Sequence, residues 1–174
     1  MNKVQTIVTG TAFVAVIAFQ QAEIQVVHEE VQEVKALVVK TSERLRYSTA
    51  EEDCLARNIY HEAGVEPTVG KYAVAQVTLN RLKDGRWGRD ICSVVYSKAQ
   101  FSWTLSKKKL NETPRGALWD ESRTVARTVL DQGARVPSLA QSTHYHADYI
   151  ERPLWAKSVA KIQQIGQHIF YKKT

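Results

Sequence analysis

Glu62 is the side chain of this 174-residue sequence that is best suited to acid–base chemistry. It follows Tyr60 in the run Leu55–Ala63, which we expect to form a largely apolar helix. A carboxyl group held against apolar and aromatic surface is harder to ionise, so its pKa rises and it can donate a proton near neutral pH. Cleavage of a glycosidic bond needs such a donor. The alternative is that Glu62 lies on the solvated face of an ordinary helix.

Turn-forming residues determine where Glu62 lies on this helix. Gly64, Pro67 and Gly70 follow it closely, so we expect the helix to end there and Glu62 to lie at the edge of a turn, accessible to substrate. The rest of the pattern predicts a mainly helical α+β domain with a small antiparallel sheet. Helices are expected at residues 51–63, 70–83, 114–133 and 153–160, and extended segments at 100–104, 142–149 and 165–171. One buried helical stripe is predicted from Trp119, Ser122, Val125, Ala126, Val129 and Leu130.

Several short blocks, taken in order, resemble a known family. They are Leu55–Ala63, Gly70 with Ala73–Val77 and Asn80-Arg81, Ile91–Tyr96, Gln100–Thr104 and Thr143–Asp148, and the ending Ile165–Tyr171 fits as well. Each block alone is weak evidence for a family. Together, their order and spacing resemble the spore-cortex-lytic and cell-wall hydrolase family typified by SleB and CwlJ, over about two thirds of the chain. The chain departs from the family at Gly64-Val65-Glu66-Pro67, where Arg-Gly-Glu-Pro is usual.

The resemblance implies a lysozyme-like groove and cleavage of peptidoglycan glycan strands with one essential glutamate, matched here by Glu62. The bond would join N-acetylmuramic acid to N-acetylglucosamine. A lysozyme-type muramidase uses a second carboxylate, whereas a lytic transglycosylase needs only one acid and leaves a 1,6-anhydro sugar. The other nearby acids, Glu66, Asp84, Asp90 and Asp148, have no evidently buried context, so the one-acid mechanism is preferred. A peptidoglycan-binding protein without turnover is the alternative outside enzymes.

Polar and aromatic residues of the matched blocks are the predicted substrate-binding set. They are Gln76, Asn80, Gln100, Phe101, Ser102, Trp103, His144, Tyr145 and His146. Phe101 and Trp103 are two apart, so they equally fit the buried face of a strand. Gln76 and Asn80 share a helix face, where they either line the groove or only cap and solvate. Tyr145 and Trp155 are the predicted sugar platforms.

The spacing His144-x-His146-x-Asp148 raises a rival, a zinc hydrolase. In an extended segment alternate side chains share a face, as metal ligands require. The helix lacks His-Glu-x-x-His, however, because residue 65 is Val. We therefore expect no metal or other cofactor and histidines that order the groove. A chelator distinguishes the two hypotheses, since it would abolish the activity of a zinc hydrolase and leave that of a metal-free glycosidase intact.

The first 46 residues differ in composition from the rest. Residues 4–22 carry no charge, and their apolar side chains are interspersed with Thr, Gln, Gly and Ala. We therefore expect residues 1–22 to be an export segment. It would be a cleaved signal peptide, an inner-membrane anchor, or a signal-anchor as in some phage endolysins. Residues 23–46 predict an amphipathic helix, which we interpret as a stalk. The alternatives are weak self-association through the seam across residues 24–45 and a helix docked on the catalytic domain. Residues 47–174 are then the catalytic domain, exported to the cell wall space.

Charge and cysteine content fit this division. Lys plus Arg equals Asp plus Glu before Tyr47, so the whole net charge of +6 belongs to residues 47–174. Positive charge favours an anionic partner such as peptidoglycan, and the sequence has no recognised nucleic-acid-binding motif. In an exported protein Cys54 and Cys92 suggest a disulfide that braces the Glu62 helix, the alternative being two buried thiols.

Overall fold

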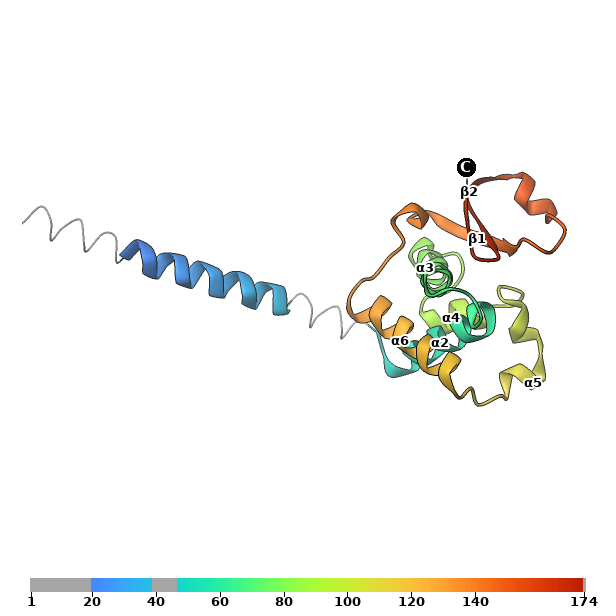
Figure 1. Ribbon diagram of the computed structural model, residues 1–174, viewed down its shortest axis with the longest axis horizontal. Helices are drawn as coiled ribbons and strands as arrows, with labels where there is room; N and C mark the ends of the chain where they lie inside the picture. Colours follow the sequence, from blue (N-terminus) through green and yellow to red (C-terminus); the bar gives the residue numbers. More distant parts are fainter. Residues whose placement is uncertain (1–19, 39–46, 174) are drawn as a thin grey trace, which may run out of the picture. The chain divides into compact units, whose positions relative to one another are not determined.

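The computed structural model describes residues 20–38 and 47–173. By its contacts the chain divides into two units, Met1–Ser42 and Glu43–Thr174, and each is described by itself. In the first unit residues 20–38 form one helix with every residue exposed (Figure 1), which agrees with the helix predicted for this part of the chain. The seam residues Ile24, Val27, Val31, Val34 and Val38 are solvent-exposed on it. Most of the predicted export segment lies outside the described residues, and none of the helices described is long and apolar enough to cross a membrane.

Helices build most of the second unit. They are α2 (Thr49–Ala63), α3 (Thr68–Asp84), α4 (Ile91–Tyr96), α5 (Lys107–Leu110) and α6 (Ala117–Asp131). Ser48 and Asp90 begin α2 and α4 with reciprocal hydrogen bonds to the third helical residue, which satisfy free amide groups at each helix start. Gly85, with φ of 76°, ends α3 in the left-handed conformation that glycine adopts without strain. The three longest helices match the predicted ones to within three residues at each end.

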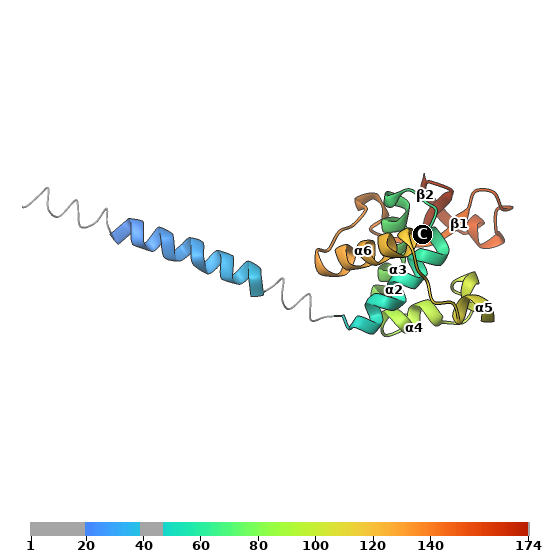
Figure 2. The ribbon, with the colours of Figure 1, turned by 60° about the horizontal axis from the view of Figure 1, so that its bottom comes forward.

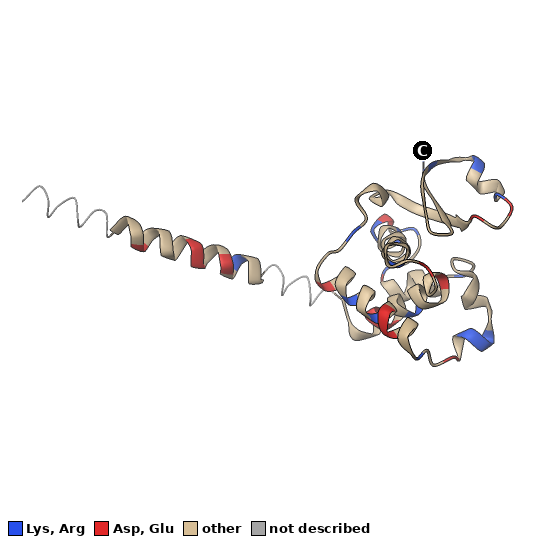
Figure 3. Cartoon of the chain, viewed as in Figure 1, with Lys and Arg blue, Asp and Glu red and all other residues tan. Residues whose placement is uncertain are grey.

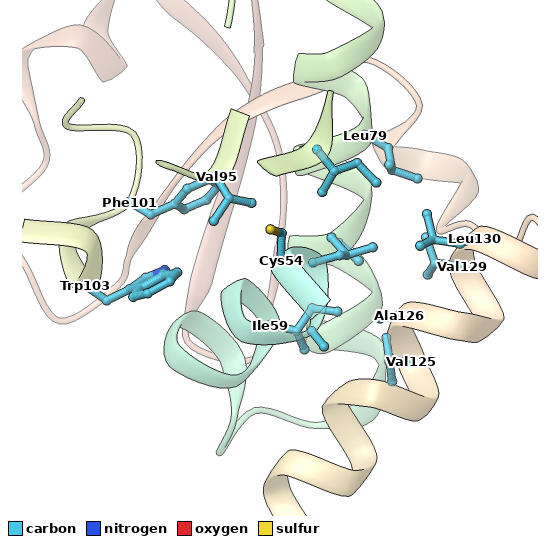
Figure 4. Packing of buried hydrophobic residues seen from close by; sticks show 14 residues of the cluster. Cys54, Ile59, Leu79, Val95, Phe101, Trp103, Val125, Ala126, Val129 and Leu130 are labelled. Atoms are coloured by element: carbon cyan, nitrogen blue, oxygen red, sulfur yellow. The ribbon is translucent and has the colours of Figure 1, made fainter. Parts of the chain in front are cut away.

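The core lies where α2 packs against α3, α4 and α6 (Figures 1 and 2). Val125, Ala126, Val129 and Leu130 of α6 point into it as the predicted stripe requires, and Ile59 of α2 faces them (Figure 4). A disulfide between Cys54 and Cys92 joins α2 to α4 at the edge of this core. The helix that carries Glu62 is therefore fixed both by packing and by a covalent link.

A three-stranded antiparallel sheet packs against α3 through β1 and β2. Its strands are β1 (Ser142–Ala147), β2 (Val159–Ile165) and β3 (His168–Lys173), in the order β1-β3-β2. Gly166, with φ of 55°, lies in the tight turn from β2 to β3. The predicted small antiparallel sheet is confirmed.

Two predicted elements are wrong. Residues 100–104 do not form a strand. Instead Ser102–Leu105 make a 3-10 turn that satisfies the backbone locally, with Thr104 N donating to Phe101 O at 3.1 Å. The helix predicted for 153–160 is reduced to a 3-10 turn at Leu154–Lys157, because the chain from Val159 onward pairs with β3.

Candidate active site

Glu62 is the penultimate residue of α2 and is half-buried. The Tyr145 hydroxyl donates a 2.8 Å hydrogen bond to its Oε2 atom. Burial raises the pKa of Glu62, and this effect exceeds the opposing influence of the Tyr145 hydrogen bond and of the positive charges on Arg81 and Lys109. The side chain is therefore a carboxylic acid that keeps its proton to higher pH than an exposed glutamate does.

Tyr145 reaches Glu62 from β1, 83 residues further along the chain. Its ring packs edge-on against His168 at 4.9 Å and in a tilted arrangement against Phe170 at 5.5 Å. Burial and the neighbouring Glu62 raise the pKa of Tyr145 well above its usual value, so the hydroxyl remains a donor. Tyr145 was predicted to bind substrate as a sugar platform; in the structure its hydroxyl contacts the proposed acid.

Arg81 is a buried cation beside this pair that the sequence did not single out. Its Nε donates to the Thr143 carbonyl at 2.9 Å, and its guanidinium carbon lies 4.9 Å from the ring centre of Trp87 and 4.8 Å from that of Phe101. Aromatic faces stabilise a cation that has lost most of its water. The charge of Arg81 thus favours the ionised form of Glu62 from a fixed position.

Gln76 and Asn80 hold the segment that leads into β1. Gln76 Oε1 accepts from the Val136 amide at 2.6 Å, and Asn80 Nδ2 donates to the Leu139 and Ser142 carbonyls at 2.9 and 2.7 Å. Each side-chain amide thus has one of its two polar atoms bonded to the backbone. These hydrogen bonds favour a structural role for Gln76 Oε1 and Asn80 Nδ2, which hold the backbone of residues 136–142.

The block 100–104 divides between the core and the surface. Phe101 and Trp103 are each 2% exposed, and Trp103 Nε1 donates to Asn58 Oδ1 at 2.9 Å, so both are core aromatics and not sugar platforms. Trp103 stacks on the His61 ring at 4.4 Å and so supports the residue next to Glu62. Gln100 is half-buried and Ser102 is exposed.

His144 and His146 pack with Trp155, at ring-centre distances of 5.3 and 6.0 Å. They alternate with Tyr145 along β1, so their side chains leave the opposite face of the strand from the one facing Glu62. Both ring nitrogens of His146 are hydrogen-bonded, to the Ala147 carbonyl at 2.8 Å and to the Tyr171 hydroxyl at 2.9 Å. This bonding favours the predicted ordering role over metal ligation.

The other acids near the blocks all have structural partners. Asp84 pairs with Arg86, Asp90 accepts from the Ser93 amide at 2.7 Å, and Asp148 accepts from Gln164 at 2.7 Å. Glu66 differs from expectation: it is only 6% exposed, because the turn between β2 and β3 covers it. Its Oε2 accepts from the Gln167 amide at 3.0 Å.

Comparison with known proteins agrees with this architecture. The sequence profile of the Cell Wall Hydrolase family matches residues 65–171. This chain belongs to that family. The similarity to the SleB and CwlJ group that the sequence blocks indicated is therefore confirmed. The profile match begins at Val65, just after Glu62, so the role of Glu62 depends on the geometry of the site.

Named relatives extend the comparison. The spore cortex-lytic enzyme of Halalkalibacterium halodurans is 32% identical over 71% of this chain and 35% of its own length, and that of Bacillus subtilis is 30% identical over 67% and 35%. The chain thus spans about a third of the length of these relatives.

Solved structures give the same fold. The catalytic domain of the germination-specific lytic transglycosylase SleB from Bacillus anthracis has a TM-score of 0.61 at 24% identity, covering 72% of this chain and 97% of that domain. The Bacillus cereus SleB catalytic domain has a TM-score of 0.58 at 24% identity, covering 72% and 92%. These structures share the fold.

Proposed function

We propose that residues 47–174 cleave peptidoglycan glycan strands between N-acetylmuramic acid and N-acetylglucosamine as a lytic transglycosylase. Glu62 acts as the single acid and base. Membership of the cell wall hydrolase family and the fold shared with a lytic transglycosylase domain support this proposal. The observation that carries it is the half-buried Glu62, whose pKa is raised by burial and whose Oε2 accepts from Tyr145.

The first step is protonation of the leaving group. Glu62 donates its proton to the oxygen that bridges the two sugars, and the bond from that oxygen to C1 of the muramic acid breaks. The departing N-acetylglucosamine leaves with a hydroxyl group. The muramic acid becomes oxocarbenium-like, and Glu62 is left as a carboxylate.

The second step uses the sugar's own nucleophile. The Glu62 carboxylate takes the proton of the C6 hydroxyl of the muramic acid while that oxygen bonds to C1. The product is a 1,6-anhydro sugar, no water is consumed, and Glu62 is again protonated. One group therefore serves as acid and then as base, for which a pKa raised toward the working pH is suited.

The surroundings of Glu62 match both steps. Because Tyr145 donates to Oε2, Oε1 is the oxygen available to carry the transferred proton. Arg81 and Lys109 favour the carboxylate that exists between the steps. Burial favours the acid before the first step and after the second. The balance of these effects keeps both protonation states within reach.

The same surroundings favour a transglycosylase over a muramidase. Among the described residues, the charged groups that influence the pKa of Glu62 are cations. Glu66 and the three aspartates considered above are engaged by other protein groups. A muramidase would need one of them free and facing the same sugar.

We also propose that the chain is exported, since its substrate lies outside the cytoplasm, and that residues 1–22 direct export while residues 23–46 space the domain from the inner membrane. Fractionation of cells that express the full chain tests this. Recovery in the membrane or periplasmic fraction supports it, and recovery only in the cytoplasm contradicts it.

Product analysis tests the reaction. The full chain is incubated with purified sacculi, and released fragments are separated and weighed by mass spectrometry. We expect anhydro-muramic ends, lighter by one water than hydrolysis products. Reducing muramic ends would identify a muramidase, and binding without release would identify a non-catalytic protein. Activity that a chelator abolishes would indicate a metal enzyme.

A further inference from the structure

Glu66 lies four residues after Glu62, in the turn between α2 and α3, and its backbone is fixed next to the end of α2. Its amide donates to the Ala63 carbonyl at 3.0 Å. Its carbonyl accepts from the buried Lys71 ammonium at 2.7 Å, and Lys71 in turn pairs with Glu121 at 3.0 Å. The backbone of Glu66 is thus hydrogen-bonded to α2 and α3, and Lys71 links it further to α6. These contacts restrict the position from which its side chain extends.

That side chain contacts the β2–β3 turn. Oε2 accepts from the Gln167 amide at 3.0 Å, and Oε1 lies 3.9 Å from Nδ1 of the buried His168. A Cβ atom at Gly166 would overlap Oε2, so the carboxylate fills the space that the missing side chain leaves. The turn and the acid therefore fit each other closely, and a small displacement of either one displaces the other.

The same turn supports the partner of Glu62. His168 begins β3, pairs with Ala147 of β1, and packs edge-on against the Tyr145 ring at 4.9 Å. Tyr145 then donates to Glu62 at 2.8 Å. The contacts therefore form a closed circuit. Glu66, in the turn after α2, contacts the β2–β3 turn, and Glu62, near the end of α2, contacts Tyr145 on β1, the strand that pairs with β3.

We infer that Glu66 is a positioning residue for catalysis: by fixing the β2–β3 turn on the end of α2, it keeps the Tyr145 hydroxyl aligned with Glu62. The inference rests on the proposed role of Glu62. Glu66 itself makes no contact with the reacting atoms in this scheme, because Gln167, His168 and Gly166 surround its carboxylate. It acts through the hairpin, and its loss releases Tyr145.

The test is the pH profile of glycan release by the full-length chain and its variants. A general acid must be protonated, so the alkaline limb of the profile follows the pKa of Glu62. Tyr145→Phe removes a hydrogen bond that lowers this pKa, and it should move the limb to higher pH. Glu66→Ala should move the limb in the same direction and lower the rate at the optimum about 10- to 100-fold, as expected for misplaced catalytic groups.

Three further variants separate positioning from general damage. Glu66→Gln keeps an acceptor for the Gln167 amide, so it should retain a limb closer to that of the unmodified chain. Glu66→Ala combined with Tyr145→Phe should move the limb no further than Tyr145→Phe alone. Glu52→Ala removes an acid of α2 that pairs with Arg127 and does not touch the hairpin, and it should leave the alkaline limb in place.

The inference is overturned if Glu66→Ala leaves the alkaline limb unmoved, whatever its rate, or if the double variant shifts beyond Tyr145→Phe. Should Glu66→Ala fail to fold, Glu66→Asp is used instead, because it keeps the charge and withdraws the acceptor from the turn. Failure of the proposed function is visible separately, since Glu62→Gln would then release glycan at the unmodified rate.

Discussion

Folding and the proposed catalysis make opposite demands on Glu62. Burial disfavours its ionised form, so the protein is less stable when this carboxyl loses its proton. Functional sites commonly contain groups with shifted pKa values that make the folded state less stable. Tyr145, Arg81 and Lys109 reduce that loss without cancelling it. A neutral side chain of the same shape should therefore give a more stable fold than the ionised Glu62 side chain does.

The variant Glu62→Gln should show this as a pH-dependent gain in stability. The folded-state pKa of Glu62 is raised, so the stability it contributes is complete below the unfolded pKa and is lost as pH rises through the folded pKa. We expect a higher Tm than that of the unmodified chain at about pH 8 and nearly the same Tm at about pH 4. Thermal unfolding measures both. Glu151→Gln, at an exposed position, is the control, and a lower Tm for Glu62→Gln at the higher pH would contradict the burial argument.

The residues around Glu62 differ in how far the sequence revealed them. Glu62 itself could be found because it interrupts a periodic helix just before a turn. Its contact with Tyr145 could not, because 83 residues separate the two and only the packing of β1 on α3 brings them together. Glu66 was expected to lack a buried context, since glutamate usually stays in water, but a turn 101 residues away covers it.

At the scale of elements, α2 is the part of the fold on which the site depends most. Asn58 in its middle accepts from Trp103 and donates to Thr78 Oγ1 at 3.1 Å, so a buried polar chain ties α2 to α3 and to the 3-10 turn at Ser102–Leu105. The disulfide ties the same helix to α4. These links restrict the movement of the backbone that carries Glu62.

The disulfide should contribute measurably to folding. It closes a loop over a sequence separation of 38, for which the chain-entropy estimate gives about 3–4 kcal/mol. Cys54→Ser with Cys92→Ser should lower the free energy of unfolding by about that amount, as urea unfolding measures. Reductant should destabilise the unmodified chain similarly and leave the double variant unchanged. A loss below about 1 kcal/mol would show that packing alone holds α2.

The helices were the most predictable elements, and the short irregular segments the least. A periodicity near 3.6 marks α6 clearly and α2 less so, whereas α3 is buried round most of its circumference and shows little periodicity. The six-residue α4 and the 3-10 turns are too short to show a period, and β2 was missed because Pro153 resembles a helix start. Short elements take their structure from whichever neighbour offers hydrogen bonds, and this information is not local.

At the scale of the whole molecule, the charge of +6 falls on the proposed catalytic domain. The basic cluster Lys107, Lys108 and Lys109 is exposed on α5 (Figure 3), and Lys109 is near enough to influence Glu62. The segment that carries this cluster is tied to α2, since Arg57 donates to the Glu112 carbonyl at 3.0 Å. For the proposed reaction, this cluster would attract anionic groups of peptidoglycan toward Glu62.

Salt should weaken this attraction. In the inactive Glu62→Gln background, the triple change of Lys107, Lys108 and Lys109 to Gln should reduce binding to sacculi at low salt. The difference should nearly vanish at about 1 M salt, where the screening length is about 3 Å. Sedimentation of sacculi measures the bound fraction. Neutralising the exposed lysines Lys157, Lys161 and Lys172 is the matched control, and an equal loss there would show that only net charge matters.

The central claim is that one protonated carboxyl group performs the cleavage, and its most direct measurement is glycan release by Glu62→Gln. Purified sacculi are digested with the full-length variant, with Glu151→Gln in parallel, and soluble fragments are quantified by mass spectrometry. We predict that Glu62→Gln is folded and binds sacculi but releases no anhydro-muramic fragments, while Glu151→Gln releases them at the unmodified rate. Release by Glu62→Gln at that same rate would contradict the account.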